Sequence, residues 1–206
     1  MKSIVWGFVI ALFLWFIMFS PYTAQKVNFW AVMFISGLIL SAYSFFHLKN
    51  QFNSLFKFDF RQVLLGLVSA VFLYLVFWVG KYLSLAIFDF SANQISSVYA
   101  TKQGTPLWLI SFLLLFIIGP AEEIFWRGFI LNKLIEQKQN PYLSLLFATF
   151  LYSFVHIWAL NIMLLIAAFV CGLFWGFLFI RYKSLVPVII SHSLWDFAVF
   201  VLFPFS

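Results

Sequence analysis

Two adjacent glutamates, Glu122 and Glu123, directly follow one of the most apolar stretches of the chain, and Arg127 lies four residues after the second acid. An ionised carboxylate is costly in a hydrocarbon environment, so ionisable groups within membrane segments indicate a functional site. On a helix, Glu123 and Arg127 share one face with the acid N-terminal, which is the better orientation for an ion pair. Glu122 points about 100° away from Glu123, so the two acids can serve different purposes.

Two histidines in later apolar segments can join these acids. His192 and Asp196 are i,i+4 neighbours, so the aspartate can orient or polarise the imidazole. His156 comes from a third segment. Taken alone, His156 reads as a hydrogen-bonded contact between helices, and Glu123–Arg127 reads as a structural ion pair. Together, three segments each bring ionisable groups to places where a membrane tolerates very few, which indicates a shared site.

This set of side chains suits two kinds of chemistry. Hydrolysis needs a base that activates water and donors for the developing oxyanion, and carboxylates with histidines supply both. Two histidines and two or three carboxylates also suit zinc with an open position for water. The spacing His-x-x-x-Asp puts two ligands on one helix face, as His-Glu-x-x-His does. A zinc site built from Glu122, His156 and His192 is therefore an open alternative.

The composition indicates what positions these residues. The 206-residue chain is 65% hydrophobic and 9% charged, whereas soluble proteins are about 25% charged. The sequence predicts an all-α fold, a polytopic transmembrane bundle with spans of roughly 20 residues. We expect about seven spans, at residues 3–20, 28–47, 62–88, 106–120 continuing to 135, 142–159, 161–180 and 184–203.

The net charge of +6 is arranged along the chain in a way that predicts orientation. Basic residues gather at alternate ends of the spans, and the opposite ends hold little more than Lys26 and Lys102. The positive-inside rule then predicts a cytoplasmic N-terminus, with some contact to anionic lipid and no role in nucleic-acid binding. The residues at the predicted cytoplasmic ends are Lys2, Lys49, Lys57, Arg61, Lys133, Lys138, Arg181 and Lys183.

The remaining features limit other interpretations. Residues 1–20 are longer than the apolar core of a usual secretory signal and no convincing cleavage site follows, so we expect an uncleaved anchor. The single cysteine, Cys171, lies within a predicted span, so no internal disulfide is expected.

We divide the chain into residues 1–105, which carry no recognised motif, and residues 106–203, which carry the ionisable groups. Solvated positions at loops or span ends are expected for His47, Asp59, Asp89 and Glu136.

The three patterns resemble those of the CPBP family (CAAX protease and bacteriocin-processing, also called Abi), intramembrane proteases related to the type II CAAX prenyl endopeptidase. The family pattern is Glu-Glu-x-x-x-Arg, then Phe-x-x-x-His, then His-x-x-x-Asn/Asp, on successive membrane regions. One position departs from it, because Tyr152 stands where phenylalanine is usual. The resemblance covers roughly residues 105–200. The matching residues are Glu122, Glu123, Arg127, Gly128, His156, His192 and Asp196.

The resemblance implies hydrolysis of peptide bonds within the membrane, in prenylated (CAAX-type) or hydrophobic peptides. It implies that Glu122 activates water, that His156 helps to position this water, and that His192 and Asp196 support the oxyanion. Glutamate-type and metalloprotease chemistry both remain open, as does the choice of Glu122 or Glu123 as the base. An ionised aspartate cannot donate a hydrogen bond, so Asp196 must be protonated or act by orienting His192.

Within the same resemblance, Glu123 and Arg127 would hold the glutamate helix in place. Gly119-Pro120, directly before the acids, could break that helix and form a cavity wall, because proline removes a backbone donor and crowds the preceding turn. The implied partners are a peptide or prenylated-protein substrate and the lipid bilayer. The expected location is a bacterial plasma membrane.

Two other classes of function stay open. A non-catalytic membrane scaffold or regulator, or a bacteriocin self-immunity protein, would keep the motif for its fold. That hypothesis predicts that Glu122→Gln preserves the phenotype, whereas disruption of Glu123–Arg127 does not. A proton-coupled transporter could use buried glutamate and histidine as a relay, although transporters more often show internal repeats, which we do not find in this sequence.

Overall fold

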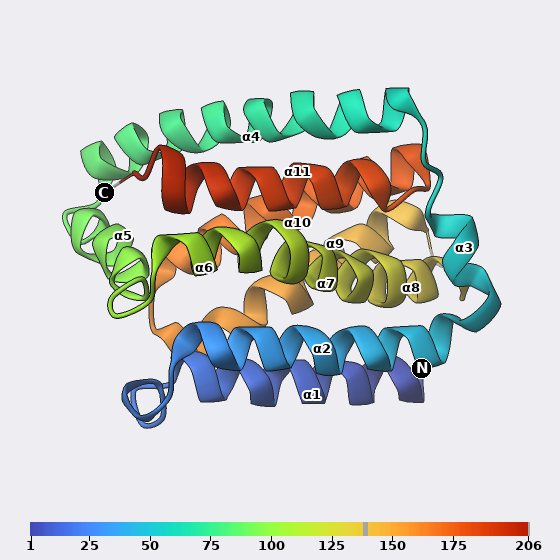
Figure 1. Cartoon of the computed structure of the whole chain (residues 1–206), viewed down its shortest axis with the longest axis horizontal. Helices are drawn as coiled ribbons and strands as arrows, with labels where there is room; N and C mark the ends of the chain where they lie inside the picture. Colours follow the sequence, from blue (N-terminus) through green and yellow to red (C-terminus); the bar gives the residue numbers. More distant parts are fainter. Residues whose placement is uncertain (138–139, 206) are drawn as a thin grey trace.

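The computed structural model describes residues 1–137 and 140–205, and this part of the chain is helical throughout its regular structure. Lys138, which was counted among the predicted cytoplasmic residues, lies outside the described residues. Long helices run roughly antiparallel to one another, and the two termini lie at opposite ends of the bundle (Figure 1). The prediction of an all-α polytopic bundle is confirmed.

Six helical segments of the described chain are long and apolar enough to cross a membrane, and a shorter apolar helix makes a seventh. Their boundaries lie within two residues of the predicted ones. The chain is therefore an integral membrane protein of about seven spans. The segments are α1 (Lys2–Phe19), α2 (Phe29–Leu48), α4 (Phe60–Ile87), the composite helix α6 to α8 (Leu107–Glu136), α9 with η5 (Pro141–Ala159), α10 (Ile162–Tyr182) and α11 with η6 (Val186–Leu202).

Short polar side chains define where several of these spans begin. Asn28 accepts a hydrogen bond from the backbone of Ala31 at 3.0 Å, and Asp59 accepts one from Gln62 at 2.8 Å. Asn140 and Asn161 cap the starts of α9 and α10 in the same way. Such N-caps satisfy backbone donors that the first helical turn leaves without partners. Asp59 is exposed, as expected, and also has this capping function.

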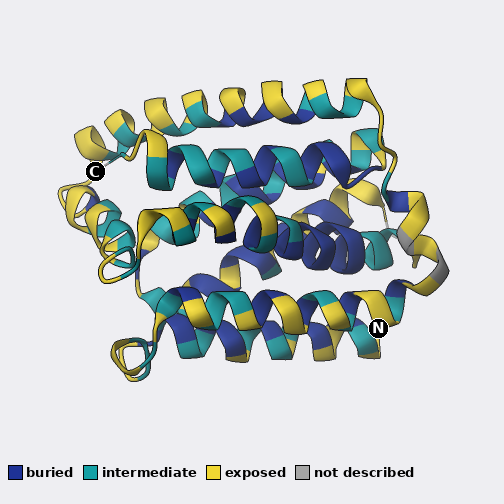
Figure 2. Ribbon diagram, viewed as in Figure 1, coloured by how far each residue is buried: buried dark blue, intermediate teal, exposed yellow. Residues whose placement is uncertain are grey.

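The outer helices carry many exposed residues, whereas the helices at the centre are largely buried (Figure 2). On α4, Val68, Phe72 and Leu75 are more than half exposed. By contrast, every residue from Ala121 to Leu131 is buried. In a chain of this composition the exposed apolar surface is the surface that contacts lipid. The acidic motif therefore lies on the most enclosed helix of the bundle.

Two α-helices in the connections between spans were not predicted. The shorter is the four-residue α3 (Phe52–Leu55), between the second and third spans. The connection at residues 89–105 contains α5 (Ser91–Ala100), which lies across one end of the bundle (Figure 1). The Asn161 side chain donates to the Gln94 carbonyl at 2.7 Å, and the Met163 backbone donates to the Gln94 side chain at 3.0 Å. These bonds attach α5 to the start of α10. This helix was not predicted, because it has only ten residues and the connection is polar.

The composite helix does not break at Gly119-Pro120, so that expectation was wrong. Instead, π-helical turns occupy Leu114–Ile118 and Ile124–Leu131, on both sides of the short α7 (Gly119–Glu123). Proline cannot donate a backbone hydrogen bond, and its ring crowds the carbonyl four residues earlier. A widened turn immediately before Pro120 accommodates both effects while the helix continues. π-Helical turns are rare and are often found at functional sites.

Gly119 is the point of closest approach between α7 and α11. A Cβ atom at this position would collide with the Ser193 side chain and would lie 3.0 Å from the Ser193 Cα atom. Small residues allow helix backbones to approach closely in membranes, where tight packing drives association. The absent side chain at Gly119 thereby brings the helix of the two glutamates against the helix of His192.

We predict that Gly119→Ala destabilises the protein by about 1–3 kcal/mol, because the added methyl group must push α7 and α11 apart. The measurement is reversible unfolding in detergent micelles. Gly80→Ala is the matched control, because nothing lies within 4 Å of a Cβ atom built there, and it should stabilise the helix by up to about 1 kcal/mol through the higher helix propensity of alanine. Equal stability of the two variants would contradict the close-approach argument.

Candidate active site

The two adjacent glutamates have separate partners. Both are buried, and Glu123 is 0% exposed. The Oε2 atom of Glu122 accepts a hydrogen bond from the hydroxyl of Tyr152 at 3.0 Å. The Oε1 atom of Glu123 lies 2.8 Å from Nη1 of Arg127 and 2.6 Å from Nδ1 of His192. The two acids therefore serve different contacts, as their angular separation predicted.

Arg127 connects the acidic helix to α10. Besides Glu123, its guanidinium donates from Nη2 to the carbonyls of Cys171 and Gly172, at 3.3 and 3.4 Å. It also lies 4.8 Å from the ring centre of Tyr152 and 5.4 Å from that of Trp175. Arginine suits this place because its planar group can pair with a carboxylate and stack on aromatic rings at the same time.

His192 lies between two carboxylates. Its Nδ1 atom is 2.6 Å from Glu123, and its Nε2 atom is 3.3 Å from Oδ2 of Asp196. The ring stacks on Trp175 with centroids 3.8 Å apart and an interplanar angle of 19°. An imidazolium donates from both nitrogens, so this arrangement suits the doubly protonated ring. The contact with Asp196 was expected from the sequence, whereas the contact with Glu123 was not, since it joins residues 69 positions apart.

His156 has a different arrangement, in the 3₁₀ turn η5 (Val155–Ala159) after α9. Its Nδ1 atom lies 3.0 Å from the backbone carbonyl of Tyr152, and its Nε2 atom lies 3.1 Å from Nε1 of Trp15. A carbonyl only accepts and an indole N–H only donates. The ring is therefore the neutral tautomer with its proton on Nδ1. Sequence reasoning missed Trp15, because nothing in its surroundings sets it apart from eight other tryptophans.

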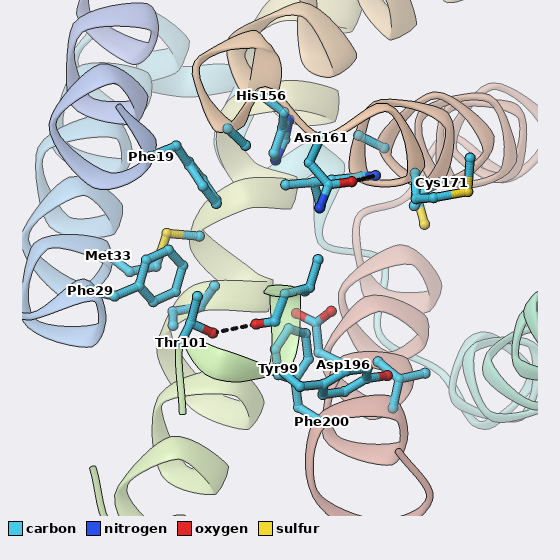
Figure 3. A pocket seen from close by; sticks show the side chains of 18 of the residues that line it. Phe19, Phe29, Met33, Tyr99, Thr101, His156, Asn161, Cys171, Asp196 and Phe200 are labelled. Carbon is cyan, nitrogen blue, oxygen red and sulfur yellow. Dashed lines mark hydrogen bonds between the residues drawn. The ribbon is translucent and has the colours of Figure 1, made fainter. Parts of the chain in front are cut away.

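All four residues predicted to be catalytic border one cavity of about 430 Å³: Glu122, His156, His192 and Asp196. Figure 3 shows His156 and Asp196 facing this cavity from different helices. Most of the remaining lining is apolar and comes in part from α1, α2 and α5, outside the motif region. Glu123 and Arg127 do not border the cavity and lie behind His192 and Tyr152. The arrangement provides a polar cluster at the wall of an apolar chamber.

The arrangement does not fit a zinc site formed by Glu122, His156 and His192. Nowhere in residues 1–137 or 140–205 do three His, Cys, Asp or Glu side chains converge in a way that could hold a metal ion. The free electron pair of His156 accepts the Trp15 N–H, and both nitrogens of His192 face carboxylate oxygens. A metal ligand needs a free pair on the imidazole.

The fold and the cavity define an integral membrane protein with a buried cluster of acids and histidines at the wall of a cavity. Residues 104–198 match the family model described as Rce1-like, type II CAAX prenyl endopeptidase Rce1-like. This match confirms the resemblance carried by the three motifs and supports CAAX-type intramembrane protease as the general class of activity. No curated protein and no solved structure matches the chain.

Removal of Arg127 should lower the free energy of unfolding much more than removal of a more exposed cation with a similar contact. Arg127→Met leaves the buried Glu123 with one cationic partner fewer, and breaking a buried pair in this way costs about 3–5 kcal/mol. Lys133→Met is the matched control, because Lys133 pairs with the exposed Glu136 at the same 2.8 Å distance. Its loss should cost less than about 1 kcal/mol. Denaturant unfolding in micelles measures both, and equal costs would contradict a special role for the buried pair.

Proposed function

We propose that this protein is an intramembrane endopeptidase that hydrolyses peptide bonds of hydrophobic or prenylated (CAAX-type) peptides, with Glu122 as the base that activates water. The observation that carries the proposal is the convergence of Glu122, His156, His192 and Asp196 on one cavity. Membership of the motif region in a family of prenyl endopeptidases supports the same class of reaction.

Glu122 is the better of the two candidate bases. Tyr152 occupies only its Oε2 atom, and the side chain borders the cavity, so Oε1 is available for water. Glu123 instead has its Oε1 atom engaged by Arg127 and His192. In the proposed reaction, Glu122 takes a proton from water while the water oxygen bonds to the peptide carbonyl carbon. The same proton then passes to the leaving nitrogen as the C–N bond breaks, which returns the carboxylate.

His192 supplies the donor for the oxyanion in this proposal. His192 and Asp196 both border the cavity, and the Nε2 atom of His192 makes a long 3.3 Å contact with Asp196. An oxyanion formed beside this nitrogen competes for its proton and is stabilised by the positive ring. Glu123 fixes the opposite nitrogen, so the ring keeps its direction. Asp196 then orients His192 as an ionised acceptor and need not donate.

Glu122→Gln should lower kcat by about 10²–10⁴-fold, because the amide cannot take a proton from water. The measurement is cleavage of a quenched prenylated peptide and of a hydrophobic peptide library by purified protein in detergent. Glu136→Gln, at an exposed position, is the control for loss of a carboxylate and should retain full activity.

The same assay with a tight zinc chelator separates the two chemistries. Activity that persists in chelator supports glutamate chemistry, whereas loss with recovery on added zinc would make the protein a metalloprotease. Absence of cleavage by folded wild-type protein would favour the scaffold hypothesis.

Tyr152→Phe should reduce kcat about threefold to tenfold with KM unchanged. The substitution keeps the aromatic ring but removes one hydrogen bond to a buried carboxylate, a loss of about 1 kcal/mol. It also restores the phenylalanine that is usual in the family, so partial activity is expected to remain. Steady-state kinetics on the same peptide measures the effect, and a variant with unchanged kcat would show that the hydroxyl does not position Glu122.

A further inference from the structure

An aromatic residue outside the family match reaches the site. Trp15 lies on α1, far in sequence from the matched residues 104–198, and is only 1% exposed. Its indole N–H donates to Nε2 of His156 at 3.1 Å, and the two rings meet edge to face at 5.9 Å. Phe19, one turn further along α1, packs on the same imidazole at 5.7 Å. The N-terminal helix therefore covers the side of His156 that would otherwise be free.

Three hydrogen bonds, joined through the covalent structure of His156 and Tyr152, connect this indole to the proposed base. Trp15 donates to Nε2 of His156, Nδ1 of His156 donates to the carbonyl of Tyr152, and the hydroxyl of Tyr152 donates to Glu122. Chemistry fixes the direction of the first two bonds, because indole N–H groups only donate and backbone carbonyls only accept, and the Tyr152 hydroxyl donates to Glu122 as a carboxylate. Three helical segments are thereby joined at atoms that are all buried.

We propose that Trp15 is a positioning residue of this site, which caps the free electron pair of His156 and holds the turn that aims the Tyr152 hydroxyl at Glu122. The proposal rests on the proposed function, in which Glu122 is the base. While α1 is docked, Nε2 of His156 cannot accept a proton from water. His156 then acts through Tyr152 as a second positioning residue, and the water is activated by Glu122 alone.

Trp15→Phe tests this role, because it keeps an aromatic ring and removes the N–H. The expected result is a fall in kcat of about fivefold to tenfold, the size of one hydrogen bond, with KM unchanged. Trp158→Phe is the matched control. The Trp158 indole donates to the Leu12 carbonyl at 3.1 Å and so joins the same two segments, α1 and η5, without touching His156. Equal kinetic losses in both variants would show that Trp15 only docks α1, and would overturn the proposal.

A spectroscopic measurement separates the hydrogen bond from the activity. The chain has three histidines, so ring-¹⁵N-labelled protein in micelles should give resolvable imidazole signals in NMR. The proposal expects a neutral His156 with its proton on Nδ1 and a hydrogen-bonded Nε2. In Trp15→Phe the Nε2 signal should move toward that of a nitrogen without a donor, and in Trp158→Phe it should stay unchanged.

The NMR spectra also test the proposal in cases where kinetic measurements cannot decide it. A wild-type His156 that carries its proton on Nε2 would overturn the proposal, whatever the activity and whether or not Trp15→Phe folds. Absence of cleavage by the wild-type protein would overturn the proposed function, whereas the histidine spectra would still decide whether Trp15 caps His156.

Discussion

The charge of Glu123 must be balanced inside the bundle, since no part of this side chain reaches the surface. A single oxygen of Glu123 accepts from both Arg127 and His192, at 2.8 and 2.6 Å. Burial of an isolated carboxylate is prohibitively costly, whereas a carboxylate with two charged donors is tolerated. This contact fixes α7 against α11, and the positions of the other groups at the cavity follow from it.

The contact between Glu123 and His192 requires α7 and α11 to approach each other closely. The local sequence permits this approach. Gly119 leaves room for Ser193, and the π-helical turns around α7 absorb the proline that follows. Backbone irregularity at this depth is acceptable in a membrane protein where it is enclosed by protein or lines a cavity. The same irregular stretch presents Glu122 to the cavity and Glu123 to the ion pair. The π-helical turns and the candidate site residues thus occupy one segment of the composite helix.

The cavity itself is assembled from both halves of the chain. The motif region supplies the acids and histidines, whereas α1, α2 and α5 supply much of the apolar lining. Such a lining excludes water from most of the chamber and strengthens electrostatic interactions at its polar wall. The N-terminal helices thus form part of the candidate site as well as of the bundle, and Trp15 contacts His156 directly.

The sequence alone determined the spans and the candidate residues. Long apolar runs admit few structures in lipid, and ionisable residues within them are rare enough to stand out. Helical spacing also predicted the pairs Glu123–Arg127 and His192–Asp196, because i,i+4 contacts depend only on local geometry. The ten-residue α5 was missed, because a short polar segment carries no strong hydrophobic periodicity.

Only the tertiary structure decided which distant groups meet. The contacts of His192 with Glu123, of Tyr152 with Glu122 and of Trp15 with His156 join different helices. Their formation depends on helix rotation, depth and close packing, which no spacing within one helix encodes. The continuation of the helix through Pro120 also depends on the tertiary structure, because widened turns and packing around α7 compensate for the missing backbone N–H of the proline. Local periodicity thus identified the candidate site residues, and packing between helices determined their partners.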